Sequence, residues 1–297
     1  MRLGHVITPQ GPRLLIEAPD GRRVMARELV ADAPVSLDAL IGEREHDWIG
    51  RFTDALDRLD GLDATDGTLA SPLLAPSSIV AIGLNYLDHC REFGTEPPAK
   101  PIVFAKLRPS ICGHGDTISW SPEVTDAVDW EAELGVVIGR PARDVEVDAA
   151  DEVIFGYTAV NDVTARDVQG AEQQWVRAKS LDGFCPIGPV VVTRDEIPDP
   201  QALAVRSRVN GETMQDSSTA EMIFSVTELV SYLSRSFTLA PGDLIATGTP
   251  VGVGKFRTPP VFLRDGDTVE VEVERIGVLR NQCRELAADD EQAEAGP

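Results

Sequence analysis

Two glutamates stand one residue apart at the start of an apolar run, in the segment Asp129-Trp-Glu-Ala-Glu-Leu-Gly-Val-Val-Ile-Gly139. The run has the length and composition of a buried strand. Side chains two apart on a strand lie on the same face, with Cα atoms about 6.5 Å apart. Glu131 and Glu133 would therefore place two carboxylates together at the end of a core strand. Such a pair repels itself and loses hydration on burial, so it requires a cation or a shared proton.

A third carboxylate occupies a similar position. Asp162 follows the apolar and β-branched run Phe155-Gly-Tyr-Thr-Ala-Val-Asn161, which indicates another strand. Three carboxylates without a His or Cys partner are typical ligands of a hard ion, so Glu131, Glu133 and Asp162 predict a Mg2+ or Mn2+ site, not a zinc site. The alternative is that the glutamates lie on the solvated face of an edge strand and that Asp162 caps a turn.

Six separate segments carry a further pattern. The first is Gly83-Leu-Asn-Tyr-Leu-Asp-His-Cys-Arg-Glu92 and the last is Pro241-Gly-Asp-Leu-Ile-Ala-Thr-Gly-Thr-Pro-Val-Gly-Val-Gly254; between them lie residues 128–134, 161–169, 178–188 and 209–212. In wording, order and spacing, residues 77–286 resemble the fumarylacetoacetate hydrolase family. The most similar branch holds 2-hydroxyhepta-2,4-diene-1,7-dioate isomerases and fumarylacetoacetate-hydrolase-domain-containing proteins of animals. The resemblance implies a mainly β, α+β fold, a mixed β-sandwich and roll with the substrate at its open end.

The resemblance also implies roles for individual residues. His89 and Glu92, three apart in a segment with a helical pattern, would form a pair that activates water. Lys179 would complete the catalytic set by stabilising the negative oxygen that develops on the substrate. The implied substrate-binding residues are Arg166, Gln169 and Thr249. The residues alone leave open an exposed helix pair for His89 and Glu92, a surface salt bridge for Lys179, and a simple turn position for Thr249.

The implied chemistry is that of a metal-dependent enzyme on small 2-oxo or 2,4-dioxo acids, acting through a metal-stabilised enolate. Hydrolytic C–C cleavage of an acylpyruvate, in aromatic catabolism, is the first prediction. An isomerase, oxaloacetate tautomerase or decarboxylase is the second, because one fold supports several chemistries. A non-catalytic cation-binding scaffold is the third hypothesis. The presence of His89, Glu92 and Lys179 in one chain argues against it.

The segment that ends at Gly254-Lys-Phe256 superficially resembles a phosphate-binding loop. That loop needs a glycine five residues before the Gly-Lys pair and a Ser or Thr after it. The chain has Thr249 and Phe256 at these positions, so nucleotide binding is not predicted.

Charge limits the partners. The 297 residues carry a formal net charge of −22, which disfavours nucleic acid and anionic membranes. A small anionic oxo acid is compatible with this charge, because a metal and a few basic residues can make a pocket locally positive. The acidity indicates either general solubility or adaptation to high salt, where self-repulsion is screened. We also expect a homodimer.

The N-terminus, the apolar stretches and the cysteines indicate the cellular compartment. The N-terminus Met-Arg-Leu-Gly-His lacks the apolar segment of a signal peptide, and no apolar stretch approaches the length of a membrane span, so we expect a cytoplasmic protein. No two of the four cysteines form a Cys-x-x-Cys motif, so all four are expected to be free thiols. They are Cys90, Cys112, Cys185 and Cys283.

The chain divides into three parts. Residues 1–70 predict a small N-terminal α+β domain, residues 71–286 the catalytic domain, and residues 287–297 a disordered acidic tail. Residues 59–76, rich in Asp, Gly, Thr, Ser and Pro, would link the first two parts. Helices are expected near residues 45–59 and over 225–234. Strands are expected at residues 13–17, 23–26, 79–82, 102–104, 134–138, 190–192, 244–246 and 268–273.

Overall fold

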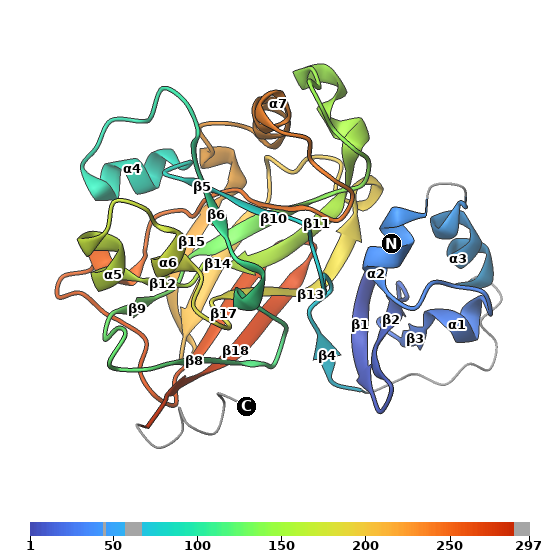
Figure 1. The fold of residues 1–297 in the computed structure, drawn as a ribbon, viewed down its shortest axis with the longest axis horizontal. Coiled ribbons are helices and arrows are strands. Elements are labelled where there is room, and N and C mark those ends of the chain that lie inside the picture. The colour runs from blue at the N-terminus through green and yellow to red at the C-terminus, as the bar shows by residue number, and fades with distance from the viewer. Residues whose placement is uncertain (44–45, 57–66, 288–297) are drawn as a thin grey trace.

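The computed structural model describes residues 1–43, 46–56 and 67–287, and its centre is a mixed sheet of 11 strands (Figure 1). These strands are β1 (Arg2–Thr8), β2 (Gly11–Glu17), β3 (Arg23–Met25), β4 (Leu69–Ala70), β5 (Ile79–Gly83), β6 (Ile102–Lys106), β7 (Ile111–Cys112), β10 (Ala132–Ile138), β11 (Ile154–Asn161), β13 (Cys185–Thr193) and β16 (Leu244–Ala246). Their main order is β3-β2-β1-β13-β11-β10-β16-β5-β6, with β4 added to β1 and β7 to β13.

A second sheet has 5 strands, and a further pair of short strands stands apart. The second sheet contains β8 (Thr117–Trp120), β14 (Ala204–Val209), β15 (Glu212–Ser218), β17 (Thr268–Val273) and β18 (Gly277–Glu285), in the order β15-β14-β17-β18-β8. The pair consists of β9 (Val128–Asp129) and β12 (Thr164–Ala165). The largest apolar cluster joins Val136 and Tyr157 of the first sheet to Val205 and Val271 of the second. The predicted mixed β-sandwich is confirmed.

The pairing of β10 with β11 positions the acidic residues. The two strands are antiparallel, with Ala132 opposite Asn161 and Glu133 opposite Val160. The start of β10 therefore lies beside the end of β11, where Asp162 follows. On its other edge β10 pairs with β16. Its side chains are buried on both faces of the sheet, with Leu134 and Val136 in one apolar cluster and Val137 in another. Burial on both faces explains why β10 is an almost continuous apolar run, whereas β17 alternates between buried and half-buried residues.

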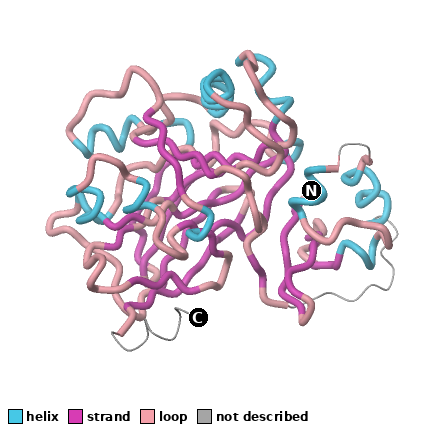
Figure 2. The backbone as a smooth tube through the Cα atoms, viewed as in Figure 1, coloured by secondary structure: helices cyan, strands magenta, loops and turns pink. Residues whose placement is uncertain are grey.

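Helices lie around the strands (Figure 2). They are α1 (Ala26–Leu29), α2 (Leu37–Gly42), α3 (Trp48–Leu56), α4 (Leu87–Phe93), α5 (Arg166–Ala171), α6 (Val176–Lys179) and α7 (Val226–Ser236). Helix α7, the longest among the described residues, begins at a capping box in which the Ser225 hydroxyl accepts a hydrogen bond from the Glu228 main chain and the Glu228 carboxylate accepts one from the Ser225 main chain. The helices expected near residues 45–59 and over 225–234 are present as α3 and α7.

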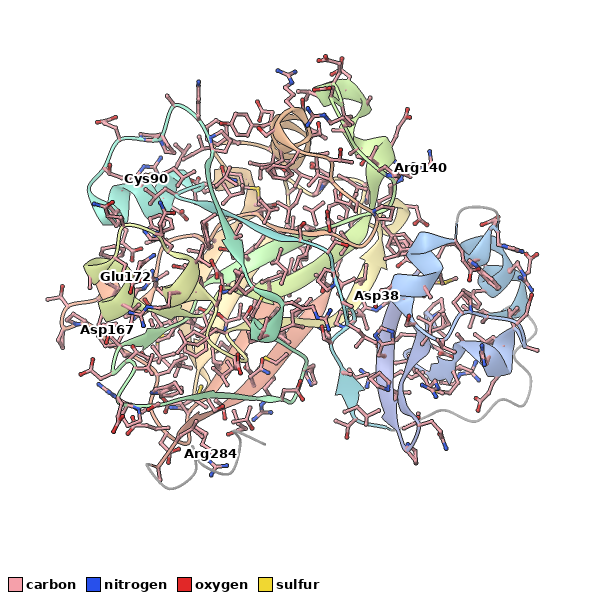
Figure 3. The ribbon with its side chains drawn as sticks, viewed as in Figure 1. Asp38, Cys90, Arg140, Asp167, Glu172 and Arg284 are labelled. Atoms are coloured by element: carbon pink, nitrogen blue, oxygen red, sulfur yellow. The ribbon has the colours of Figure 1, made fainter. Side chains whose placement is uncertain are left out.

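The N-terminal unit of β1–β3 and α1–α3 continues the central sheet. Strand β1 pairs with β13 of the catalytic part, with Leu3 opposite Val191. On the side facing the rest of the molecule, Asp38 of α2 accepts hydrogen bonds from the main chain of Leu74 and Ala75, 3.2 and 3.1 Å away (Figure 3). Whether residues 1–70 form a separate domain stays a prediction.

Part of the expected linker is strand. Residues 69–70 form β4, which pairs with β1, so the predicted linker over 59–76 is wrong at these two residues. Two main-chain pairing positions, His5 with Ala70 and Val6 with Leu69, outweigh the turn-rich composition there. Residues 59–66 of this linker lie outside the described residues, as does the expected tail from residue 288 onward. Within the described part, no helix is long and apolar enough to cross a membrane, and all four cysteines are free thiols.

Candidate active site

A cavity of about 210 Å³ lies at the end of the molecule opposite the N-terminal unit, where α4, α5 and α6 gather (Figure 1). Its walls come from β5 and the loop after it, α4, β6, α5, α6 and the short 3₁₀ helix over Gly254–Phe256. The lining residues are Ile82, Gly83, Leu84, His89, Phe93, Phe104, Glu131, Arg166, Gln169, Trp175, Lys179, Thr249, Lys255 and Phe256.

Three carboxylates meet beside this cavity, and one of them, Glu131, lines it. Glu131, Glu133 and Asp162 each offer an oxygen within 4.8 Å of the other two. Their exposed fractions are 6%, 1% and 0%. The alternative of a solvated edge strand is therefore wrong, since β10 is an interior strand and both Glu133 within it and Glu131 directly before it are buried.

Two lysines bind the acidic cluster. Lys179 Nζ donates to Glu131 Oε2 and to Asp162 Oδ2, both at 2.7 Å. Lys106 Nζ donates to Asp162 Oδ1 at 2.6 Å and also to the main-chain carbonyl of Lys179. Lys179 is thus a buried bridge between two acids, and its alternative as a surface salt bridge is excluded.

Arg166 forms the third cationic contact. Its Nε donates to Asp129 Oδ2 at 2.7 Å, and its Nη2 lies 2.7 Å from Glu131 Oε1. Its Nη1 donates to Gln169 Oε1 at 3.1 Å, which holds that amide at the cavity wall. Asp129 and Glu131 therefore hold the guanidinium in place, and Gln169 joins it to the cavity wall.

Buried charges at this site do not balance. Four buried carboxylates, Asp129, Glu131, Glu133 and Asp162, accompany three buried cations, Lys106, Arg166 and Lys179. Burial opposes ionisation of Glu131, but Lys179 and Arg166 outweigh it and lower the pKa of Glu131 to about 2. Burial, with the charges of Asp162 and Glu131, raises the pKa of Glu133 well above its usual range.

This excess of buried carboxylates indicates whether a metal ion could bind here. The oxygen-only set Glu131, Glu133 and Asp162 suits a hard divalent cation. Such an ion would supply the positive charge that the protein itself lacks around Glu133, whose ionisation it would favour. The residues present therefore fit Mg2+ or Mn2+.

Main-chain contacts hold the cluster in place. The Gly248 amide donates to Glu133 Oε2 at 2.9 Å. Gly248 has a φ of 100°, and a Cβ there would lie 2.8 Å from the Asn85 side chain, so the position requires glycine. The Asp162 amide donates to the Glu131 carbonyl at 2.9 Å, which ties the two acids together through the backbone.

His89 and Glu92 face one another on α4. His89 Nδ1 lies 2.9 Å from Glu92 Oε2, and their side chains are 7% and 13% exposed, which excludes the exposed helix pair. An ionised carboxylate only accepts, so Nδ1 carries the hydrogen and Nε2 is the basic nitrogen. The Gly252 amide fixes Glu92 by donating to its Oε1 at 3.0 Å. The pair has the geometry of a general base at the cavity wall.

Thr249 is also more than a turn residue. Its hydroxyl donates to the Ala132 carbonyl at 3.0 Å and accepts from Gln215 Nε2 at 2.8 Å. It is buried and lines the cavity. The structure thus brings together the nine residues that the sequence singles out: His89, Glu92, Glu131, Glu133, Asp162, Arg166, Gln169, Lys179 and Thr249.

Three charged residues of the site were not predicted. Lys106 binds Asp162, Asp129 binds Arg166, and Lys255 lines the cavity. A signal existed for the two lysines, because the chain has only four lysines and Lys106 closes an apolar strand. Asp129 had no such signal, since its partner lies 37 residues away.

Comparison with known proteins identifies the family. Residues 78–284 match the family Fumarylacetoacetate (FAA) hydrolase C-terminal. The mitochondrial oxaloacetate tautomerase FAHD2A of Bos taurus is 44% identical over 291 residues, covering 95% of this chain and 91% of that protein. The oxaloacetate tautomerase YisK of Bacillus subtilis is 44% identical over 243 residues, covering 81% and 78%. The structure of a fumarylacetoacetate hydrolase from psychrophilic Exiguobacterium antarcticum has a TM-score of 0.84 and 38% identity, covering 96% and 100%. The chain belongs to the fumarylacetoacetate hydrolase family.

Proposed function

We propose that this protein is a divalent-metal-dependent tautomerase of small 2-oxo acids of the oxaloacetate type. The observation that carries the proposal is the buried cluster of Glu131, Glu133 and Asp162 next to a cavity lined by Lys179 and His89. The names of the two similar proteins, both oxaloacetate tautomerases, support tautomerisation over the C–C hydrolysis that the sequence favoured first.

In this mechanism Glu131, Glu133 and Asp162 would hold Mg2+ or Mn2+. When bound, the ion would supply Lewis-acid chemistry to the substrate. Arg166, held by Asp129, presents its guanidinium to the substrate carboxylate, and Gln169 and Thr249 orient the substrate by hydrogen bonds. Because the cavity is small, these contacts fix which carbon faces His89.

Proton transfer is assigned to His89. Its Nε2 takes a proton from C3 of the keto acid, and Glu92 stabilises the imidazolium through Nδ1. The Lys179 ammonium stabilises the negative charge that develops on the oxygen at C2. Return of the proton from Nε2 to that oxygen gives the enol, and the reverse sequence gives the keto form.

Hydrolytic C–C cleavage is the second candidate. The buried His89–Glu92 pair favours it, because the same basic nitrogen can remove a proton from water for attack on a carbonyl carbon. The hydrolase name of the similar Exiguobacterium structure also supports this candidate. Decarboxylation of oxaloacetate would use the same oxygen-binding groups.

A paired assay separates these functions. Enolic oxaloacetate is mixed with the Mg2+-loaded protein and its ultraviolet absorbance is followed, while pyruvate release is measured from acylpyruvates and from oxaloacetate. The proposal predicts rapid loss of the enol signal with little pyruvate from either substrate. Pyruvate release from acylpyruvate without accelerated enol conversion would overturn it in favour of the hydrolase. Mg2+ binding without turnover of any oxo acid would favour the non-catalytic scaffold.

Other properties stay predictions. The charge of −22 disfavours nucleic acid and anionic membranes as partners, and a homodimer is expected. The cytoplasmic location is also a prediction, and one of the similar proteins is described as mitochondrial.

A further inference from the structure

Lys255 differs from the other cations of the cavity. Arg166 is paired with Asp129 and Glu131, and Lys179 is paired with Glu131 and Asp162. Lys255 is half-buried and lines the same cavity. Across residues 1–43, 46–56 and 67–287 its ammonium has no carboxylate within ion-pair distance; it lies 5.7 Å from the ring of Phe256.

The backbone around Lys255 is fixed. The amides of Gly254 and Lys255 donate to the two oxygens of Asp129, at 2.7 and 3.0 Å. A Cβ on Gly254 would collide with the carbonyl oxygen of Val261, so only glycine fits this turn. The carboxylate that orients Arg166 therefore also positions Lys255. The main-chain hydrogen bonds to Asp129 thus hold Lys255 at the cavity wall.

The next residue ties this turn to the catalytic helix. The Phe256 ring packs edge-on against Phe93 of α4, with ring centroids 4.9 Å apart, and lies 5.9 Å from the His89 ring. Lys255 thus belongs to the wall that contains His89, whereas the acidic cluster lies at the ends of β10 and β11.

An unpaired ammonium in this position is energetically unfavourable. Burial and the nearby charge of Arg166 lower the pKa of Lys255, because both disfavour its charged form. The remaining cavity-lining cations already have protein carboxylates as partners. An anion that enters the cavity would be the missing partner of Lys255.

We propose that Lys255 binds the second carboxylate of a dicarboxylic 2-oxo acid and so makes the enzyme select dicarboxylates over monocarboxylates. The inference rests on the proposed function, in which the 2-oxo acid end of the substrate is held by the metal-binding cluster and Arg166. The other end of the substrate then faces the wall of Lys255 and His89. Lys255 is a specificity-determining residue, and the proton transfer itself does not require it.

A binding experiment tests this without turnover. The Mg2+-loaded protein is titrated calorimetrically with 2-oxoglutarate and with 2-oxovalerate, two acids of equal chain length that differ in the terminal carboxylate. The wild type should bind 2-oxoglutarate about tenfold or more tighter, as one charge-assisted contact provides. Lys255→Met should remove that difference by weakening 2-oxoglutarate alone, and Lys255→Arg should keep part of it. Lys100→Met, at an exposed lysine, is the matched control and should behave as the wild type.

Several results would overturn the inference. The inference fails if the wild type binds 2-oxoglutarate and 2-oxovalerate equally. It also fails if Lys255→Met keeps the wild-type preference for 2-oxoglutarate. An equal loss for both acids would mean that Lys255 only supports the turn. The outcome is separable from the proposed function: a protein that prefers the dicarboxylate through Lys255 but converts no oxo acid supports this inference and refutes the tautomerase. A protein that converts oxaloacetate, but whose preference for the dicarboxylate is unchanged in Lys255→Met, supports the tautomerase and refutes this inference.

Discussion

Lys106 donates a hydrogen bond from its ammonium to Asp162 Oδ1 across 2.6 Å, and neither side chain is exposed to solvent. Lys106 ends β6, the outermost strand at one edge of the central sheet, and Asp162 follows β11 in its interior. Because Lys106 also donates to the main chain of Lys179, it connects a predicted metal ligand to a predicted catalytic residue. It acts as a positioning residue for both.

Replacing this lysine should destabilise the protein. Lys106→Met leaves Asp162 with Lys179 as its remaining cation, and removing one partner of a buried ion pair costs about 3–5 kcal/mol. Urea unfolding in EDTA measures the loss. Lys100→Met should change the stability by less than about 0.5 kcal/mol, as expected for an exposed position. A Lys106→Met protein as stable as the wild type would show that the pair contributes no net stability.

Removing the proposed base should slow tautomerisation. His89→Ala is expected to lower kcat for oxaloacetate by about a hundredfold or more, the effect of a lost general base, and Glu92→Gln by less. Metal content, measured on the same samples, should stay at the wild-type level because neither residue belongs to the acidic cluster. An unchanged enol-to-keto rate in metal-loaded His89→Ala would show that His89 does not move the proton at C3.

The predicted metal ligands could be found from sequence because their geometry is local. Glu133 lies in β10 and Glu131 directly before it, so the two-residue repeat of a strand was enough to predict that they lie close together, and Asp162 ends a recognisable apolar run. Their meeting depends on the antiparallel pairing of β10 with β11, which the sequence did not predict. The partners of the cluster were not predictable this way. Lys106 and Asp162 are 56 residues apart, and no local pattern joins them.

Strands β14 and β15 were not predicted, and the reason is physical. In β14 the buried positions are Val205, Ser207 and Val209, so a polar residue interrupts the apolar face. Ser207 is satisfied by a hydrogen bond to Gln215 of β15, at 2.9 Å, a contact that sequence alone does not reveal. The turn Asn210-Gly211, with φ values of 53° and 82°, was a hairpin signal that could have located both strands.

A buried histidine should make stability depend on pH. His5 Nδ1 lies 2.9 Å from the Ser71 carbonyl, and its Nε2 accepts from the Leu37 amide at 3.0 Å. Burial lowers the pKa of His5 from its usual 6.5, against the opposing effects of the Ser71 hydrogen bond and Asp38. The unfolded chain therefore binds this proton first. Its contribution to stability is complete above pH 6.5 and is lost as the pH falls below that value.

The measurement is urea unfolding of wild type and His5→Gln at about pH 7.5 and about pH 5.5, conditions on either side of the ordinary histidine pKa. The wild type should lose more stability between these pH values than His5→Gln, which cannot titrate there. His46→Gln, at an exposed position, should follow the wild type. Equal losses in wild type and His5→Gln would contradict the assignment.

Salt should stabilise the protein if its acidity is an adaptation. A net charge of −22 repels itself in the folded state, and the Debye length falls from about 10 Å at 0.1 M to about 3 Å at 1 M salt. We expect the melting temperature to rise by several degrees between low and molar KCl. A flat melting temperature over this range would favour ordinary acidity over adaptation to salt.

Metal dependence of tautomerisation tests the central claim most directly. The enol-to-keto rate of oxaloacetate is measured for wild type after EDTA treatment, after addition of Mg2+ or Mn2+, and for Glu133→Gln and Asp162→Asn, with Glu212→Gln at an exposed position as the control. EDTA should lower the rate at least about a hundredfold, the metals should restore it, and the two cluster variants should not respond to metal. Full activity in a metal-free wild type, or metal-restored activity in Glu133→Gln and Asp162→Asn, would contradict a metal-dependent tautomerase at this site.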